Sequence, residues 1–129
     1  LEQETSNEVI NFMKSVLAFG ASTGQGGKNP KTDPTVRDAL DRAANSIGKR
    51  FEKRPLVEAK VRKVVADVYF ALRDPEQAVG HLERVHDLRR AHLGPDHPLT
   101  LIDANNLGTV YMNLKRFAEA EPLLTAVLA

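Results

Sequence analysis

Apolar side chains recur every three or four residues along most of the chain, which is the spacing of one face of an α-helix. The first such stripe lies between residues 6 and 19 and consists of Val9, Ile10, Phe12, Met13, Val16 and Leu17. Thr5 and Glu8 have the spacing of a capping box at its start. We expect this segment, residues 1–19, to pack on the following helices and cover their open end. Binding of a partner by this helix is the alternative.

Residues 20–34 are rich in Gly, Ser, Thr and Pro and contain little that a core could bury, which predicts a flexible linker. Within this linker, the glycines before Lys28 suggest a phosphate-binding loop. That motif requires a glycine five residues before Gly27 and a serine or threonine after the lysine. The sequence has Ser22 and Asn29 at these positions, so we do not expect nucleotide binding.

Five further helices are predicted after the linker. Thr35 is expected to cap one helix within residues 35–56, and the next helix runs from about 56 to 72. Another begins at Pro75 and ends at Gly94, where a glycine followed by proline stops the helix. The last two helices begin at Pro98 and after Lys115-Arg116.

The last part of the chain repeats itself at an offset of 42 residues. The matched pairs are Val65 with Leu107, Ala66 with Gly108, Val68 with Val110, Tyr69 with Tyr111, Leu72 with Leu114, Ala78 with Ala120, Leu82 with Leu124 and Val85 with Val127. A fixed period of this length indicates stacked helical units. The small residues at matched positions let two helix backbones approach closely, and the tyrosines fill the space between them.

This order of apolar, small and aromatic positions resembles the tetratricopeptide repeat, whose signature falls here on Ala66, Tyr69, Ala78, Gly108, Tyr111 and Ala120. The usual unit has about 34 residues, and the additional residues here lie between repeats, from Ala91 to Pro98. A unit of 42 residues resembles the kinesin-light-chain-like branch. The aromatic usually found early in the first helix of the repeat is absent, because Arg62 and Ala104 occupy those positions.

The resemblance implies an all-α fold, a short right-handed superhelix of antiparallel helix pairs with an extra N-terminal helical unit. It places one repeat at residues 57–98 and a truncated second repeat at 99–129, with residues 35–56 as a degenerate half-repeat helix. The run from Thr35 to Ala44, with Arg50-Phe51 and the run from Pro55 to Ala59, also resembles a stretch found beside such repeats in large bacterial serine/threonine kinases. Since the chain starts at Leu1 and ends within an apolar helical pattern, we expect it to belong to a longer protein with further repeats.

Composition adds mainly exclusions. The 129 residues carry a net charge of +1, which gives no overall attraction to nucleic acid or anionic membranes, and contain no cysteine. No apolar run reaches the length of a membrane span. No two histidines have the spacing of a metal site on one helical face; His81 and His86 are expected to face solvent and His97 to belong to a turn. We expect no enzyme, no catalytic residue, no metal and no cofactor.

By resemblance, the first helix of each repeat lines a concave groove that binds extended peptides. The groove positions are Lys60, Lys63, Asp67, Phe70, Ile102, Asn105, Asn106, Thr109, Met112 and Asn113. The Asn106 amide can pair with a peptide backbone, and Phe70 and Met112 offer apolar contact. Lys63 could bind an acidic group, but Asp67 would repel one. The function expected is a non-catalytic protein–protein interaction module that binds a peptide or protein segment. In the alternative, the asparagines form hydrogen bonds only to neighbouring helices and bind no partner.

Two other functions are kept open. The apolar edge near Leu123, Val127 and Leu128 could pair between copies of the chain and make it a self-associating structural spacer of a bacterial signalling kinase. The basic stretch from Lys49 to Lys63 could bind nucleic acid or an anionic surface, but it lacks interleaved aromatics, so nucleic acid is not favoured. We expect a soluble segment that does not insert into a membrane, and we favour the cytoplasm as its location. The longer protein to which it belongs could still be anchored in a membrane.

Overall fold

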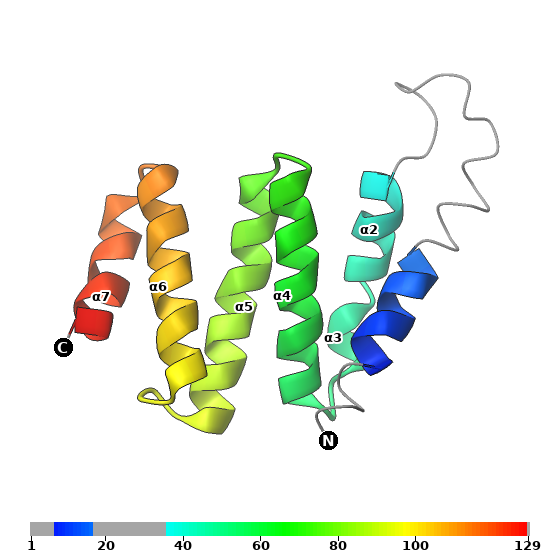
Figure 1. Ribbon diagram of the computed structural model, residues 1–129, viewed down its shortest axis with the longest axis horizontal. Coiled ribbons are helices and arrows are strands. Elements are labelled where there is room, and N and C mark those ends of the chain that lie inside the picture. Colours follow the sequence, from blue (N-terminus) through cyan, green and yellow to red (C-terminus); the bar gives the residue numbers. More distant parts are fainter. Residues whose placement is uncertain (1–6, 17–35, 129) are drawn as a thin grey trace.

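The computed structural model describes residues 7–16 and 36–128, and every regular element within these ranges is an α-helix (Figure 1). An N-terminal helix covers residues 7–16. The later helices are α2 (Val36–Ala44), α3 (Ile47–Arg50), α4 (Pro55–Ala71), α5 (Pro75–Leu93), α6 (Pro98–Asn113) and α7 (Phe117–Leu128). The predicted all-α fold class is confirmed. The expected cap at Thr5, the linker with its glycine-rich stretch, and the Thr35 cap lie outside the described residues.

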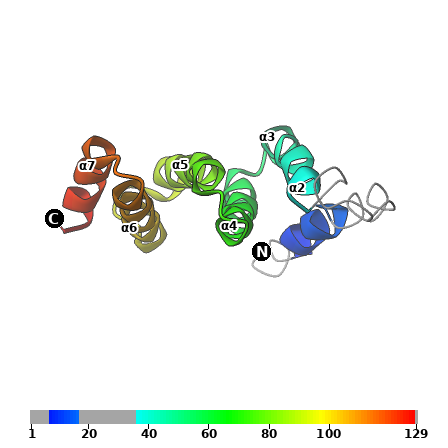
Figure 2. The same ribbon diagram turned by 90° about the horizontal axis from the view of Figure 1, so that it is seen from above.

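Apart from the short helix α3, which lies in the same row as α2, successive helices run in opposite directions and alternate between two rows (Figures 1 and 2). The N-terminal helix, α4 and α6 lie in one row, and α2, α5 and α7 lie in the other. Helices that follow each other in sequence are also the main packing partners, α4 with α5, α5 with α6 and α6 with α7. The described helices therefore form three antiparallel pairs placed side by side.

The helix boundaries follow from local capping. Asp74 accepts a hydrogen bond from the Gln77 N–H at 3.3 Å, and His97 Nδ1 accepts one from the Leu99 N–H at 3.1 Å. Each of these capping residues is followed by a proline, which is favoured at the first helical position because it lacks an N–H that would need a partner. Helix α5 ends at Gly94, whose φ of 100° is accessible to glycine but strained for other residues.

The turns inside the second and third helix pairs share one backbone geometry. Arg73 and Lys115 follow α4 and α6 with positive φ values of 61° and 62°. The residue after each of them donates its N–H to the carbonyl five residues earlier, at 2.9 Å in the first turn and 2.7 Å in the second. This is the Schellman arrangement that satisfies the last carbonyls of a helix. The sequence repeat is thus also a repeat of backbone conformation.

The core runs through all three helix pairs. Its large members include Phe12, Leu40, Ile47, Phe51, Val65, Tyr69, Leu82, Leu107 and Tyr111. Ala66, Ala78 and Ala120 are completely buried where helices meet. At Gly108, a Cβ atom would lie only 2.7 Å from Leu124 Cδ2, so a side chain there would collide with α7. The small positions of the repeat are therefore sites of close contact between helices.

The segment predicted as one helix within residues 35–56 is divided in two. Ser46 donates its N–H to the Ala43 carbonyl at 3.0 Å, and its hydroxyl donates to the same oxygen at 2.7 Å. This local bonding competes with the continuous helical ladder, which explains the turn between α2 and α3. Leu40 on α2, Ile47 on α3 and Phe51 just after α3 nevertheless all reach the core, because α3 lies in the same row as α2.

The N-terminal helix packs against α2 and α3 through its apolar face. Phe12 and Val16 are buried in the common core, and the ring of Phe12 contacts that of Phe51 with centroids 6.5 Å apart. Glu8 forms an ion pair with Arg54 at 3.4 Å. This helix lies in the same row as α4 and α6 (Figure 2), where the first helix of a preceding pair would be expected.

Candidate functional site

A groove between α4 and α6 opens into a cavity of about 450 Å³. Three helices line it: Lys63, Asp67 and Phe70 from α4, Leu82 from α5, and Asn105, Asn106, Thr109 and Val110 from α6. Residues at i, i+4 and i+7 share a helix face, which is why the α4 residues point into the same space. Six of the ten predicted groove residues therefore meet at one cavity.

The other four predicted residues do not line this cavity. Ile102 and Met112 are exposed on α6, at 52% and 44% of their full surface. Asn113 is also exposed and Lys60 is half-buried. These four residues lie on the same two helices, one or two turns from the cavity or at its margin. Any contact they make to a ligand would extend the central site.

Two apolar residues of the cavity were missed by sequence reasoning. Leu82 comes from α5 and Val110 from the packing face of α6, and both belong to the interhelical core. The repeat pattern marks them correctly as core positions, since they match Leu124 and Val68. One edge of each side chain faces the groove because of the spacing between α4 and α6. The sequence pattern does not indicate this spacing.

The charges of the groove are paired with each other. Lys63 Nζ lies 2.7 Å from Asp67 Oδ1, one helical turn away. Such an exposed pair contributes little stability, about 0.3–0.5 kcal/mol, but it cancels the positive charge that Lys63 would otherwise present. The groove therefore offers no net attraction to an acidic group.

The amide-bearing side of the groove is on α6. Asn105 is exposed and Asn106 is half-buried. The Thr109 hydroxyl donates to the Asn105 carbonyl at 2.9 Å, which leaves its oxygen available as an acceptor. Phe70 faces these polar groups from α4 and is 37% exposed. The cavity therefore combines amide donors and acceptors with an aromatic surface, as peptide-recognition sites commonly do.

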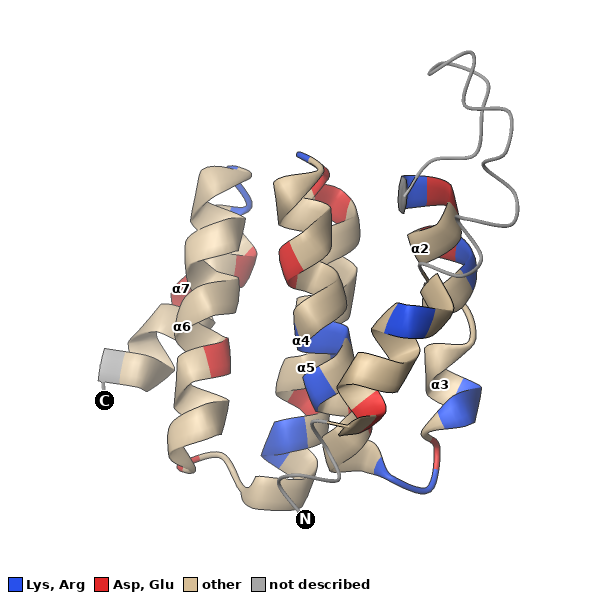
Figure 3. Ribbon diagram, turned by 45° about the vertical axis from the view of Figure 1, so that its right-hand side comes forward, with Lys and Arg blue, Asp and Glu red and all other residues tan. Residues whose placement is uncertain are grey.

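The basic stretch from Lys49 to Lys63 is largely engaged within the protein. Arg50 lies over the rings of Phe12 and Phe51, with its guanidinium carbon 5.7 and 5.4 Å from their centroids. Arg62 Nε donates to Glu58 at 2.7 Å. Figure 3 shows the Lys and Arg positions around α3 and the adjoining ends of α4 and α5, mixed with acidic ones. Glu52 and Glu58 interrupt this stretch, whereas binding to phosphate backbones depends on clustered positive charge.

Two buried carboxylates were not predicted. Glu58 is 2% exposed and pairs with Arg62 and Arg84, while Asp103 pairs with Arg89 at 2.8 Å. Burial raises the pKa of Asp103 above its usual value, against the opposing effect of the Arg89 guanidinium. The offset of 42 residues offered a signal, because Asp103 matches the core position of Val61.

The histidines depart in part from expectation. His81 was expected to face solvent, but it is half-buried and stacks on Tyr69 with centroids 5.6 Å apart. Burial, and then the positive charge of Arg62, lower the pKa of His81 to about 4. His86 is also half-buried rather than exposed. His97 lies in the turn before α6, as predicted, and it also caps that helix.

Within residues 7–16 and 36–128, no group of three or more His, Asp or Glu side chains could hold a metal ion. None of the helices in this part of the chain is long and apolar enough to cross a membrane. The side chains that line the groove offer hydrogen-bonding groups and apolar surface.

Comparison with known families decides the identity of the fold. A family model described as Tetratricopeptide repeat matches residues 58–129, which is more than half of the chain. The chain belongs to the tetratricopeptide repeat family. Tetratricopeptide repeats generally mediate protein–protein interactions and are typically non-catalytic. A search of curated proteins found no match.

Family membership explains the architecture. The matched region contains α4 to α7, the two helix pairs that share the 42-residue offset. Gly108 allows the close approach of α6 and α7 within one pair, whereas Tyr111 contacts Glu83 on α5 of the preceding pair. The kinesin-light-chain-like branch and the link to bacterial kinases remain predictions.

Proposed function

We propose that this tetratricopeptide repeat chain binds an extended peptide segment of a partner protein in the groove between α4 and α6. The observation that carries the proposal is the meeting of Asn105, Asn106 and Phe70 at one cavity of about 450 Å³. A pocket of this volume is within the range that holds small ligands and peptide side chains. In a larger protein, such binding would scaffold or regulate the assembly of partners.

The chemistry of the groove suits a peptide backbone with at least one apolar side chain. An asparagine amide can donate to a peptide carbonyl and accept from the next N–H. Phe70 and Leu82 offer an apolar surface for the side chain between these contacts. Because Lys63 is paired with Asp67, an acidic peptide gains no net attraction.

The test is capture of partners from a lysate of the source cells, read by mass spectrometry. The groove variant is Lys63→Ala/Asn106→Ala. Its matched control is Lys49→Ala/Asn11→Ala, which removes the same two side-chain types at exposed positions outside the groove. We expect a partner retained by wild type and by the control but lost by the groove variant, while circular dichroism stays unchanged in both.

A second arm locates the contact. A photoreactive benzoylphenylalanine replaces Phe70 at the groove or Phe117, which is 53% exposed at the start of α7. We expect cross-links to a partner from position 70 and none to that partner from position 117. Equal retention by all variants, together with no partner cross-link at position 70, would exclude the groove as the binding site.

Self-association through α7 is a second candidate, favoured by the uneven burial of matched residues. Leu82 and Val85 on α5 are buried, whereas the matching Leu124 and Val127 on α7 are only half-buried. This apolar edge, which also includes Leu123, could pair with a second copy and make the chain a structural spacer. Sedimentation velocity of wild type and Val127→Glu tests it. A monomer at all concentrations would exclude this candidate.

A phosphate-binding role for the basic stretch is less well supported, since Arg50, Arg54 and Arg62 already contact the protein itself. Binding of nucleic acid that weakens steeply with salt would be required for it. The parent protein proposed from sequence, a bacterial signalling kinase, rests on resemblance alone. A kinase domain, either captured by the groove or encoded in the longer gene product, would support that proposal.

A further inference from the structure

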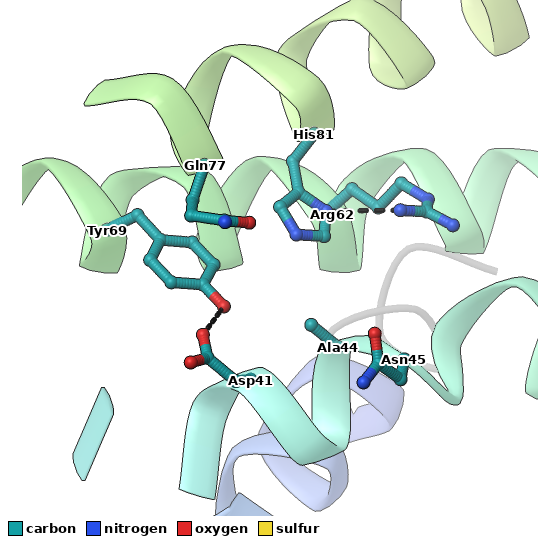
Figure 4. A pocket seen from close by; sticks show the side chains of 7 residues that line it. All are labelled: Asp41, Ala44, Asn45, Arg62, Tyr69, Gln77 and His81. Atoms are coloured by element: carbon teal, nitrogen blue, oxygen red, sulfur yellow. Dashed lines mark hydrogen bonds between the residues drawn. The ribbon is translucent and has the colours of Figure 1, made fainter. Parts of the chain in front are cut away.

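A second pocket lies between α2, α4 and α5, away from the groove. Its volume is about 490 Å³, and it is lined by Asp41, Ala44, Asn45, Arg62, Tyr69, Gln77 and His81 (Figure 4). Six of these seven residues carry polar side-chain groups. The groove between α4 and α6 shares none of them, so the two sites are independent. We name this second site the polar pocket.

The polar pocket has a negative end and a positive end. Asp41 on α2 accepts a hydrogen bond from the Tyr69 hydroxyl through one carboxylate oxygen. Arg62 and His81 stand on the other side of the space (Figure 4). Gln77 also lines the pocket, and its amide can donate or accept. Asp41 therefore faces Arg62 across the cavity, while Arg62 also forms an ion pair with Glu58 at 2.7 Å.

The donors at the positive end are fixed by their other bonds. Arg62 Nε is held by Glu58 at 2.7 Å, and Arg62 Nη1 lies 3.1 Å from His81 Nδ1. Burial and the Arg62 charge hold the pKa of His81 near 4, so the ring is neutral at pH 7 and Nδ1 accepts from the arginine. The proton of the neutral ring is then on Nε2, which faces the pocket as a donor (Figure 4). Arg62 keeps further N–H groups unused by Glu58 and His81.

Comparison with the next repeat indicates that packing does not require this positive end. The positions 42 residues later that match Arg62 and His81 are Ala104, which is buried, and Leu123, which is half-buried against the apolar core. By contrast, the acid at the other end is a feature of both repeats, since Glu83 matches Asp41. Partly buried polar groups cost free energy unless they are fully paired. When one repeat carries polar groups at positions where the next repeat carries apolar ones, a functional site is the expected reason.

We propose that the polar pocket binds a small zwitterion, a free α-amino acid. The α-carboxylate would contact Arg62 and the Nε2–H of His81, and the α-ammonium would contact Asp41. Charge-assisted hydrogen bonds of this kind are about twice as strong as neutral ones. The amides of Gln77 and Asn45 at the margin would contact the amino-acid side chain and select among polar ones.

The test is isothermal titration of the whole chain with L-glutamine, L-serine, L-aspartate and L-leucine at millimolar concentrations. We expect at least one of them to bind. The N-acetyl derivative of that amino acid lacks the ammonium and its carboxamide lacks the carboxylate, so both should bind about tenfold more weakly or worse. Binding of either derivative as tightly as the parent would overturn the zwitterion assignment.

Three variants assign the ends of the site. His81→Leu and Arg62→Ala introduce the residues that the next repeat carries at these positions, and Asp41→Asn keeps an acceptor for Tyr69. Each should lower the affinity by about tenfold or more, the value of one lost charged contact. Asn106→Ala in the groove is the control and should leave amino-acid affinity unchanged.

Folding of each variant is checked by circular dichroism and thermal unfolding before titration. NMR provides a readout that does not depend on variants: the amino acid should shift the side-chain resonances of His81 and Gln77 and leave those of Asn106 in place. The absence of any heat and any shift with all four amino acids would exclude the site. Shifts confined to Asn106 would also exclude it and place the contact in the groove.

Discussion

The Tyr111 hydroxyl on α6 donates a hydrogen bond to the carboxylate of Glu83 on α5. The same contact occurs 42 residues earlier, from Tyr69 on α4 to Asp41 on α2. Each contact ties the first helix of a repeat to the second helix of the preceding unit. The recurrence supports α2 as the second helix of a unit before the first complete repeat.

These two bonds should stabilise the stack. In Tyr111→Phe or Tyr69→Phe, the ring keeps its packing but the carboxylate loses its donor. A hydrogen bond to a charged group contributes about 1.5–3 kcal/mol, and we expect the lower end of this range because neither carboxylate is fully buried. Urea unfolding measures the change. Phe117→Tyr, at an exposed position, is a control that should change stability little.

The same tyrosines should make the fold sensitive to alkaline pH. Burial, and then the hydrogen bond to the neighbouring carboxylate, raise the pKa of Tyr69 and Tyr111 well above the ordinary value of 10. The folded state therefore holds these protons more tightly than the unfolded state. Stability from this source is complete below pH 10 and is lost as the pH rises toward the folded-state pKa values.

Tyrosinate absorbance at 295 nm checks this prediction during a pH titration. Both tyrosines of the chain should titrate above pH 10 in the folded protein and near pH 10 in urea. The double variant Tyr69→Phe/Tyr111→Phe should lose less stability than wild type between pH 9 and pH 11. Ordinary titration at pH 10 in the folded state would contradict the burial of both hydroxyls.

Replacing glycine with alanine should have opposite effects on stability at Gly80 and Gly108. At Gly80, exposed on α5, an added Cβ meets no atom within 4 Å. Gly80→Ala should therefore stabilise the helix by about 0.5–1 kcal/mol. At Gly108 the Cβ would lie 2.7 Å from Leu124, and overpacking costs about 1–3 kcal/mol. Thermal unfolding should show a higher Tm for the first variant and a lower Tm for the second, and equal shifts would refute the close approach of α6 and α7.

The two Schellman turns should accept glycine. Arg73 and Lys115 hold positive φ values that cost a residue with a Cβ about 1 kcal/mol. Lys115→Gly removes this strain, and we expect a net gain of several tenths of a kcal/mol after the entropy of the unfolded glycine is counted. Lys115→Ala is the matched control, because it removes the same charge while keeping the Cβ. Chemical denaturation should rank glycine above alanine at this position.

His81 should make the fold sensitive to acid. Its pKa is lowered to about 4, below the unfolded value of 6.5, because burial and Arg62 disfavour the charged ring. The unfolded state then binds a proton first, so the stability that depends on the neutral ring is present above pH 6.5 and is lost as the pH falls toward 4. NMR titration of the His81 imidazole should give a midpoint near 4. In His81→Leu, the decrease of Tm between pH 7 and pH 4 should be smaller.

Much of the fold follows from local patterns in the sequence. The 42-residue offset places Tyr69 and Tyr111 correctly in the core, and Asp74 and the prolines mark helix starts that the structure reproduces. These features are visible in sequence because the repeat packs helices that are neighbours along the chain. The division between α2 and α3 is the main exception, since it depends on the bonding choice of Ser46.

The groove could be predicted only as a set of helix faces. Helical spacing places Lys63, Asp67 and Phe70 on one face of α4, and all three line the cavity. The extent of the cavity depends on how far α6 stands from α4, which excludes Ile102 and Met112 from its lining. Spacing along one helix gives a direction for each side chain but no distance to the next helix.

The sequence by itself determined the helices, the repeat offset and the small and aromatic positions where repeats meet, because each depends on contacts close in the chain. The tertiary structure decided which polar groups face one another. Arg62 and His81 are 19 residues apart and Asp41 and Tyr69 are 28 apart, yet they line one pocket. These pairs form, and the pKa of His81 is lowered, because the side chains are buried between packed helices. The sequence pattern shows each helix only as a separate amphipathic face and does not indicate which faces meet.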